Sequence, residues 1–161
     1  MTTDATSLPP SLARYLAGPD GVVQRIRLGA YAWCEQGASV LLTRIAEAGP
    51  GAGEWTLPGG GLDFGEDPAD GAIREVREET GYQVAIGDLL GIRSDVLEPA
   101  ETISGHRIHS IQVVYAGTIA GGELQHEFEG STDLAAWVPF ADLDALPTVE
   151  LVTFARRAAG R

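Results

Sequence analysis

The pattern of apolar and polar residues predicts two kinds of element along this chain. Segments rich in β-branched and aromatic residues, bounded by turn-forming residues, predict β-strands. These segments are 22–33, 39–45, 55–57, 84–96, 109–119 and 135–138. A turn signal at 35–37 predicts that the first two strands form a hairpin, residues 46–54 predict an exposed loop, and residues 58–61 predict a glycine-rich turn. Gly87 and Gly91 interrupt the segment 84–96, so it predicts either one strand or two.

A helical period appears between residues 67 and 81. Four apolar positions recur at the spacing of one helix face and predict its buried side: Ala69, Ala72, Ile73 and Val76. Asp67 suits the N-cap, Pro68 suits the first helical position, and Gly81 suits the position just beyond the end. The pattern therefore predicts one helix with clear ends that packs against the sheet.

Two further helices are predicted near the C-terminus, a short one at 141–146 and a longer one at 148–159. Strands on both sides of one strong helix, with another helix at the end, predict a mixed α/β sandwich. A length of 161 residues fits one domain. We expect residues 1–20 to form a loose N-terminal arm or, near 12–16, a short helix, and residues 21–161 to form the domain.

Acidic residues on the predicted helix carry the candidate chemistry. Glu75, Glu78 and Glu79 stand at positions i, i+3 and i+4, which share one face of a helix. Three like charges side by side cost stability unless a cation lies between them. We expect these carboxylates to line the edge of a cleft and to hold a hard divalent ion, most simply Mg²⁺. Arg74 lies four residues before Glu78 and can orient it through an ion pair.

The same segment carries the spacing G-x5-E-x7-R-E-U-x-E-E-x-G-U, where U is a bulky apolar residue. The residues at these positions are Gly60, Glu66, Arg74, Glu75, Val76, Glu78, Glu79, Gly81 and Tyr82. The segment resembles the Nudix box, with a looser match at Tyr82 because an aliphatic residue is commoner there. The resemblance continues upstream through residues 55–61 and, more weakly, downstream through residues 130–140.

The resemblance implies a Nudix-type α/β/α sandwich with a mixed sheet. It also implies a pyrophosphohydrolase that cleaves a nucleoside diphosphate linked to another group, with Mg²⁺ or Mn²⁺ as cofactor. By position in the box, Glu78 and Glu79 are the expected metal ligands and Glu75 is the next. The Gly59 carbonyl is expected to turn toward the metal, and Glu66 is expected either to support the metal site or to brace the loop.

The general base is a box glutamate in some members of the family and a glutamate of a later loop in others. Glu123, Glu127 and Glu129 are the candidates outside the box, and their alternative interpretation is a solvated acidic loop. We place Glu127 in the expected catalytic group with Arg74 and the three helix glutamates.

The box specifies the reaction and leaves the substrate open. The expected substrates are a nucleotide sugar such as ADP-ribose or a nucleoside triphosphate, including an oxidised one, while dinucleoside polyphosphates also remain open. The alternative is a non-catalytic Nudix-like domain that senses a nucleotide. Such domains usually lack one or more of the metal-binding glutamates, and none is missing here, which favours the enzyme. Many members pair, so the resemblance also allows a homodimer.

Composition narrows the partners and the compartment. A net charge of −12 argues against general binding to nucleic acid or to an anionic membrane, and all 11 basic residues are arginine. There is no apolar run long enough for a membrane span and no secretory signal pattern, so we expect a cytoplasmic protein. Cys34 lies in an apolar stretch and is interpreted as a buried strand residue. Other side chains are interpreted as lacking a binding role: His106 and His109, which have no third zinc ligand, and the surface charges Arg25, Arg27, Arg93 and Arg107.

Overall fold

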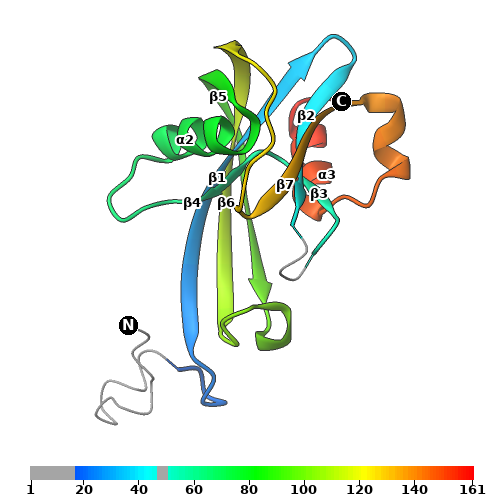
Figure 1. The fold of residues 1–161 in the computed structure, drawn as a ribbon. Helices are drawn as coiled ribbons and strands as arrows, with labels where there is room; N and C mark the ends of the chain where they lie inside the picture. Colours follow the sequence, from blue (N-terminus) through cyan, green and yellow to red (C-terminus); the bar gives the residue numbers. More distant parts are fainter. Residues whose placement is uncertain (1–16, 47–50) are drawn as a thin grey trace.

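The computed structural model describes residues 17–46 and 51–161, and Figure 1 shows the arrangement of their strands and helices. The predicted helix near 12–16 and most of the predicted arm therefore lie outside the described residues. The strands are β1 (Gln24–Gln36), β2 (Ser39–Ile45), β3 (Trp55–Thr56), β4 (Gly59–Gly61), β5 (Tyr82–Leu97), β6 (Arg107–Gly122) and β7 (Thr132–Pro139). The helices are α2 (Pro68–Thr80) and α3 (Glu150–Ala158), with 3₁₀ turns η2 (Pro99–Glu101) and η3 (Phe140–Ala145).

The seven strands form one mixed sheet. Its main path runs in the order β3-β2-β1-β6-β5, with β4 paired to β1 and β7 paired to β2. The pairing of β1 with β6 is parallel, and the other pairings are antiparallel. The predicted hairpin of β1 and β2 is confirmed, but the two strands pair only next to their turn, where Glu35 faces Val40. Further along, β1 pairs with β4 instead, so the sheet divides at this point.

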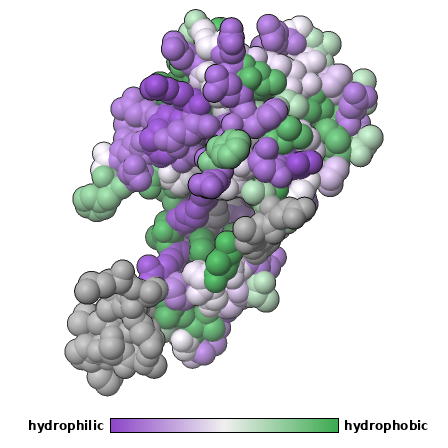
Figure 2. All heavy atoms as spheres, in the orientation of Figure 1, coloured by the Kyte–Doolittle hydropathy of each residue, from purple (hydrophilic) through white to green (hydrophobic). Residues whose placement is uncertain are grey.

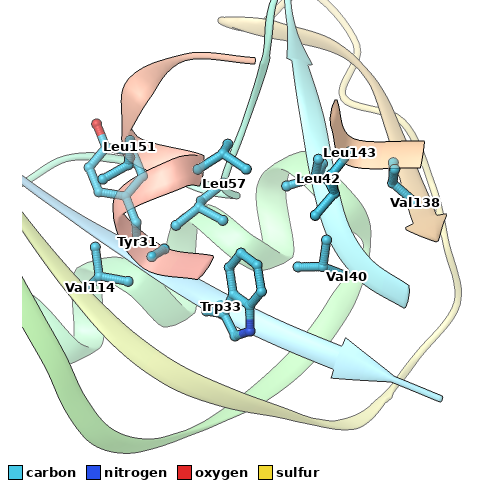
Figure 3. Close-up of a cluster of buried hydrophobic side chains, with 11 residues drawn as sticks. Tyr31, Trp33, Val40, Leu42, Leu57, Val114, Val138, Leu143 and Leu151 are labelled. Carbon is cyan, nitrogen blue, oxygen red and sulfur yellow. The ribbon is translucent and has the colours of Figure 1, made fainter. Parts of the chain in front are cut away.

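Alternation along β1 separates two apolar layers. Tyr31 and Trp33 belong to the cluster that contains Leu151 of α3, part of which appears in Figure 3. Ala32 and Cys34 point the other way and join Val76 of α2. Because successive residues of a strand face opposite sides of a sheet, the two helices cover opposite faces. The expected α/β/α sandwich is therefore confirmed.

The burial of Cys34 agrees with its structural interpretation. The side chain is fully buried, and burial raises the pKa of its thiol to about 12. A thiol that stays protonated at neutral pH is a poor nucleophile. Trp33 is buried as well and stacks on Phe140, with 6.3 Å between the ring centroids.

One strand prediction needed correction, and the structure decides one alternative that the sequence left open. Residues 59–61 form a short strand against β1 instead of a turn, with Gly59 opposite Tyr31 and Gly61 opposite Gly29. Residues 82–97 form one long strand, because local register shifts near Gly91 absorb the break that its glycines suggested. A Cβ atom on Gly91 would lie 2.9 Å from the ring of Phe154, so this glycine lets β5 approach α3 closely.

Helix α2 begins and ends where the sequence predicts. The Asp67 side chain accepts a hydrogen bond from the Ala69 N–H at 2.8 Å, and Gly81 has a left-handed φ of 74°. The predicted buried face was partly wrong, because Ile73 is 37% exposed whereas Glu79 and Thr80 are buried. The helix is rotated so that its small residues and the end of its last turn pack against the sheet. This rotation buries the Glu79 side chain between the helix and the sheet.

The solvent-facing side of α2 is polar, and Figure 2 shows a group of hydrophilic residues there. None of the helices in the described part of the chain combines the length and apolar content that a membrane crossing needs.

Candidate active site

The candidate site forms where α2 crosses the glycine strand β4. The Gly59 N–H donates a hydrogen bond to Glu79 Oε2 at 2.9 Å. A Cβ atom on Gly59 would lie 2.4 Å from the Ala30 carbonyl oxygen, and one on Gly60 would lie 2.7 Å from the Glu75 carboxyl carbon. Glycine at 59 therefore lets β4 approach β1 closely, and glycine at 60 leaves the space that the Glu75 carboxylate occupies.

Glu79 is the most deeply placed of the helix glutamates. It is only 1% exposed, yet Glu79 and Glu75 both line the cleft as the sequence predicts, whereas Glu78 is not among the lining residues. The pKa of Glu79 is raised to about 8, mainly by burial and also by the charges of Glu75 and Glu127, against the opposing effect of the Gly59 N–H. Glu75 shows the same tendency, because burial also raises the pKa of its carboxyl group. Both groups therefore carry negative charge only at a cost unless a cation compensates it.

Arg74 joins the three segments around these carboxylates. Its Nε and Nη2 atoms donate to the two oxygens of Glu66 at 2.8 and 2.9 Å, and Nη2 also donates to the Gly61 carbonyl at 3.1 Å. Its Nη1 atom donates to Glu75 at 2.8 Å and to Glu78 at 3.3 Å. The expected pair with Glu78 is present, but it is the longest of these contacts. Arg74 thus acts mainly as a clamp that ties the loop before α2 and strand β4 to the helix.

Glu66 is committed to this clamp. Arg74 holds the pKa of Glu66 down at about 2, and the Asp63 N–H assists by donating to Glu66 Oε2 at 3.0 Å. Both carboxylate oxygens therefore already have strong donors. Of the two roles expected for Glu66, this arrangement favours bracing the loop.

Glu127 is the residue of the later acidic loop that reaches the site. Its Oε2 atom accepts hydrogen bonds from the Thr132 N–H at 3.1 Å and the Thr132 hydroxyl at 2.9 Å. Its carboxyl group fills the place of a side chain at Gly130, where a Cβ atom would lie 1.7 Å from the carboxyl carbon. The charge of Glu127 helps to raise the pKa of both Glu75 and Glu79, whereas Glu123 and Glu129 are exposed.

The oxygen atoms of these glutamates are ligands that suit a hard divalent cation, although the side chains do not converge on one point. Among residues 17–46 and 51–161, no three His, Cys, Asp or Glu side chains converge into a ready-made metal cluster, and this includes the two histidines considered for zinc. Glu78 is half-exposed and can turn, while Glu75 and Glu79 rest on the glycine strand. Oxygen donors with unmet negative charge are what Mg²⁺ and Mn²⁺ prefer. At Gly59 it is the N–H group that contacts an acidic side chain, since it donates to Glu79 Oε2 at 2.9 Å.

A cleft with a volume of about 900 Å³ opens beside these carboxylates. It extends from β4 across β1, β6 and β5 toward η2 and the start of α3. Arg27 and Arg93 line it, although the sequence interpretation left both as surface charges. Arg27 lies four residues before the buried Tyr31 on a strand, so both side chains face the same side. That parity was the signal that could have placed Arg27 in the cleft.

Comparison with known proteins gives matches of one kind. A family model described as NUDIX domain matches residues 23–156. An ADP-ribose pyrophosphatase of Methanocaldococcus jannaschii is 35% identical over 98 residues, which are 61% of this chain and 52% of that protein. The chain spans about half, or less, of the length of the curated relatives that it matches first.

Solved structures agree with the fold. A MutT NUDIX hydrolase from Burkholderia pseudomallei superposes with a TM-score of 0.68 at 26% identity, over 83% of this chain and 98% of that one. A NUDIX hydrolase from Nitrosomonas europaea gives a TM-score of 0.71 at 22% identity, over 84% and 89% of the two chains, and shows the shared fold.

Proposed function

Because this chain belongs to the Nudix family, we propose that it is a pyrophosphohydrolase that cleaves a nucleoside diphosphate linked to another group. The observation that carries the proposal is the buried Glu79 carboxylate beside Glu75 on the backbone of Gly59 and Gly60. The substrate is a nucleotide sugar such as ADP-ribose or a nucleoside triphosphate, including an oxidised one. The name of the archaeal relative, an ADP-ribose pyrophosphatase, supports the first class.

Glu75, Glu78 and Glu79 would hold Mg²⁺, or Mn²⁺ as an alternative, together with the Gly59 carbonyl. When bound, the ion supplies neutralisation of the charge on the phosphate oxygens. Arg74 and Glu66 keep the loop, the helix and β4 in register around these ligands, as the hydrogen bonds of Arg74 to all three segments suggest.

Glu127 acts as the general base in this proposal. Its carboxylate takes a proton from the attacking water while the water oxygen forms a bond to phosphorus and the bridging P–O bond breaks. The leaving phosphate keeps the electron pair of that bond. Three observations support this role: Thr132 donates two hydrogen bonds to the carboxylate, Gly130 leaves room for it, and its charge acts on Glu75 and Glu79.

The proposal is tested by incubating the purified chain with Mg²⁺ and a set of nucleoside diphosphate derivatives and reading the products by mass. Glu78→Gln and Glu79→Gln should abolish most of the hydrolysis while the chain remains folded. The matched control is Asp88→Asn, which removes an exposed carboxylate of β5 and should keep full activity. Equal activity in the wild type and both glutamine variants would contradict the metal-ligand assignment. Tight binding of a nucleotide without any turnover would instead favour the sensor domain.

A further inference from the structure

Apart from the carboxylates of α2, the cleft is lined by more acidic than basic side chains. Four acidic side chains and two arginines line this outer part: Glu54, Asp95, Glu101, Glu150, Arg27 and Arg93. A polyphosphate needs cations or N–H donors along its whole length. The number of arginines that remain free to bind phosphate therefore limits how many phosphates the cleft can accept.

Arg93 is already neutralised by protein groups. Its Nη2 atom donates to Asp95 at 2.9 Å and to Glu150 at 3.1 Å, and its Nη1 atom donates to the Gln112 side-chain oxygen at 2.9 Å. The side chain is only 18% exposed, so these partners hold it in place. A phosphate would have to displace two carboxylates to bind Arg93, which makes it a poor phosphate ligand.

Arg27 is the arginine of the cleft that is open to a ligand. Among the described residues it has no carboxylate within ion-pair distance, and its Nη1 atom donates only to the Tyr31 hydroxyl at 3.3 Å. Its guanidinium group lies 3.4 Å from the position of a Cβ atom on Gly61. Arg27 thus stands next to β4, within reach of a phosphate that is held at the carboxylates of α2.

In the rest of the cleft, the lining residues that the structure describes offer acceptors and hydroxyl groups, and none of them is a free cation. Glu54 and Glu101 line it together with uncharged polar residues of β6 and of the segment just after η2, such as Ser110 and Thr102. Carboxylates accept hydrogen bonds from hydroxyl groups, whereas they repel a further phosphate. The exposed apolar side chain of Ile103 provides a neutral surface at the same end.

We infer that this cleft selects a diphosphate whose far substituent is uncharged and rich in hydroxyl groups, as in a nucleotide sugar, and disfavours a triphosphate. The inference rests on the proposed function, since it names the substrate class of the same site. Arg27 accounts for one phosphate beside the candidate metal site, and Glu54 and Glu101 exclude an additional negative group beyond it.

The test compares ADP-ribose with ATP, because these ligands share adenosine diphosphate and differ in the far group. With Mg²⁺ and the full chain, kcat/KM for ADP-ribose should exceed that for ATP at least tenfold. Glu54→Gln and Glu101→Gln should each reduce this ratio severalfold by improving the use of ATP. Glu101→Gln keeps an oxygen that can accept the Glu98 N–H, which the Glu101 carboxylate accepts at 2.8 Å, so the local fold is retained.

Two further variants separate selectivity from general loss of activity. Arg27→Gln should weaken the use of both ligands by a similar factor and leave their ratio unchanged. Asp88→Asn removes an exposed carboxylate outside the cleft and should change neither value. An ATP preference in the wild type, or an unchanged ratio in both glutamate variants, would overturn the inference while leaving the proposed hydrolysis intact.

Binding provides a second measurement that does not require turnover. Dissociation constants for ADP-ribose and ATP are measured by calorimetry in Mg²⁺ with Glu127→Gln, which keeps the acidic residues of α2 and of the outer cleft. Tighter binding of ADP-ribose supports the inference, and equal or tighter binding of ATP refutes it. If the wild type hydrolyses neither ligand nor any other nucleoside diphosphate derivative, the proposed function fails, and the binding ratio still decides the selectivity of the cleft.

Discussion

Replacing Glu79 by glutamine should remove a pH dependence from the stability of the metal-free protein. Burial raises the pKa of Glu79 from its usual value of 4.5 to about 8. The folded state therefore holds a proton that the unfolded chain has released at intermediate pH. For such a group the stabilisation is fully present below pH 4.5 and is lost as the pH rises toward and through 8. The wild-type protein should accordingly become less stable between pH 5 and pH 8.

The size of this loss follows from the two pKa values. At about 1.4 kcal/mol per pKa unit, the free energy of unfolding should fall by on the order of 3 kcal/mol between pH 5 and pH 8. Glutamine is neutral throughout this range, and its amide oxygen can still accept the hydrogen bond of the Gly59 N–H. The variant should therefore match the wild type near pH 5 and exceed its stability at pH 8.

Urea unfolding in the presence of a chelator, at several pH values from 5 to 8.5, measures this difference. The comparison is made between the two proteins at each pH, because burial raises the pKa of Glu75 as well and gives it the same sign. Carboxyl groups with a lowered pKa, such as Glu35 beside Arg161, lose their contribution to the free energy of unfolding only below pH 4.5. They therefore do not affect the comparison between pH 5 and pH 8. Mg²⁺ should stabilise the wild type at pH 8 much more than the variant.

Parallel stability curves for the two proteins from pH 5 to pH 8 would refute this reasoning, since they would mean that Glu79 does not bind a proton more tightly in the folded state. A variant that is less stable at every pH would also count against it. That outcome would indicate that the charged carboxylate, and not the neutral one, is what the fold accommodates.

Three further substitutions test the surroundings of the site. Gly60→Ala should displace Glu75 and weaken Mg²⁺ affinity roughly tenfold by calorimetry, whereas Gly61→Ala, whose Cβ atom meets nothing closer than 3.4 Å, should change it less than about twofold. Glu127→Gln should lower kcat by about 10²- to 10⁴-fold in a product assay and leave Mg²⁺ affinity nearly unchanged. Arg74→Lys loses the two-pronged contact and should lower the free energy of unfolding in urea by about 2 kcal/mol, and an unchanged value would show that the clamp contributes nothing to the fold.

The parts of the fold that the sequence predicted correctly are those fixed by local interactions. Helix α2 begins at Asp67 and ends at Gly81 because both caps act within a few residues of the helix. The hairpin of β1 and β2 follows from its turn, where Gly37 has a φ of 60°. The looser match at Tyr82 depends instead on a distant residue, since the Trp137 indole N–H donates to the Tyr82 hydroxyl at 3.1 Å.

The errors concern interactions between distant segments. A glycine triplet has no strand propensity, and residues 59–61 form a strand because β1 offers an unpaired edge after it leaves β2. The inward turn of Glu79 depends on that same strand, whose first N–H donates to it across 20 residues of sequence. Periodicity alone favoured Ile73 for the buried face, because the helical pattern contains no information about the Gly59 N–H, the buried donor that binds Glu79.

Arg27 and Arg93 show that the sequence also does not reveal which charged side chain is free to bind a ligand. Both are arginines on strands that line one cleft, and the nearby difference in sequence is Asp95, two residues after Arg93, which forms an ion pair with it. Arg93 is neutralised partly by Glu150, which lies 57 residues away. Arg27 keeps hydrogen-bonding capacity for a ligand, because among the described residues it donates only to the Tyr31 hydroxyl, and Glu75 attracts it through its charge without lying within ion-pair distance. Which arginine can bind phosphate is therefore a property of the tertiary structure.

The four glutamates of the box also fall into a group that is neutralised by an internal arginine and a group that is not. This difference explains why one motif contains both an arginine and four glutamates. Arg74 satisfies Glu66 completely and keeps its pKa near 2. It also contacts Glu75, yet burial and the neighbouring Glu78 and Glu127 still raise the pKa of that carboxyl group. One internal cation is thus enough to fix the loop but too little to neutralise the carboxylates on β4. In the proposed function, a divalent cation from outside the chain neutralises the residual negative charge, and Glu79, the most deeply buried of the four glutamates, gains most from it.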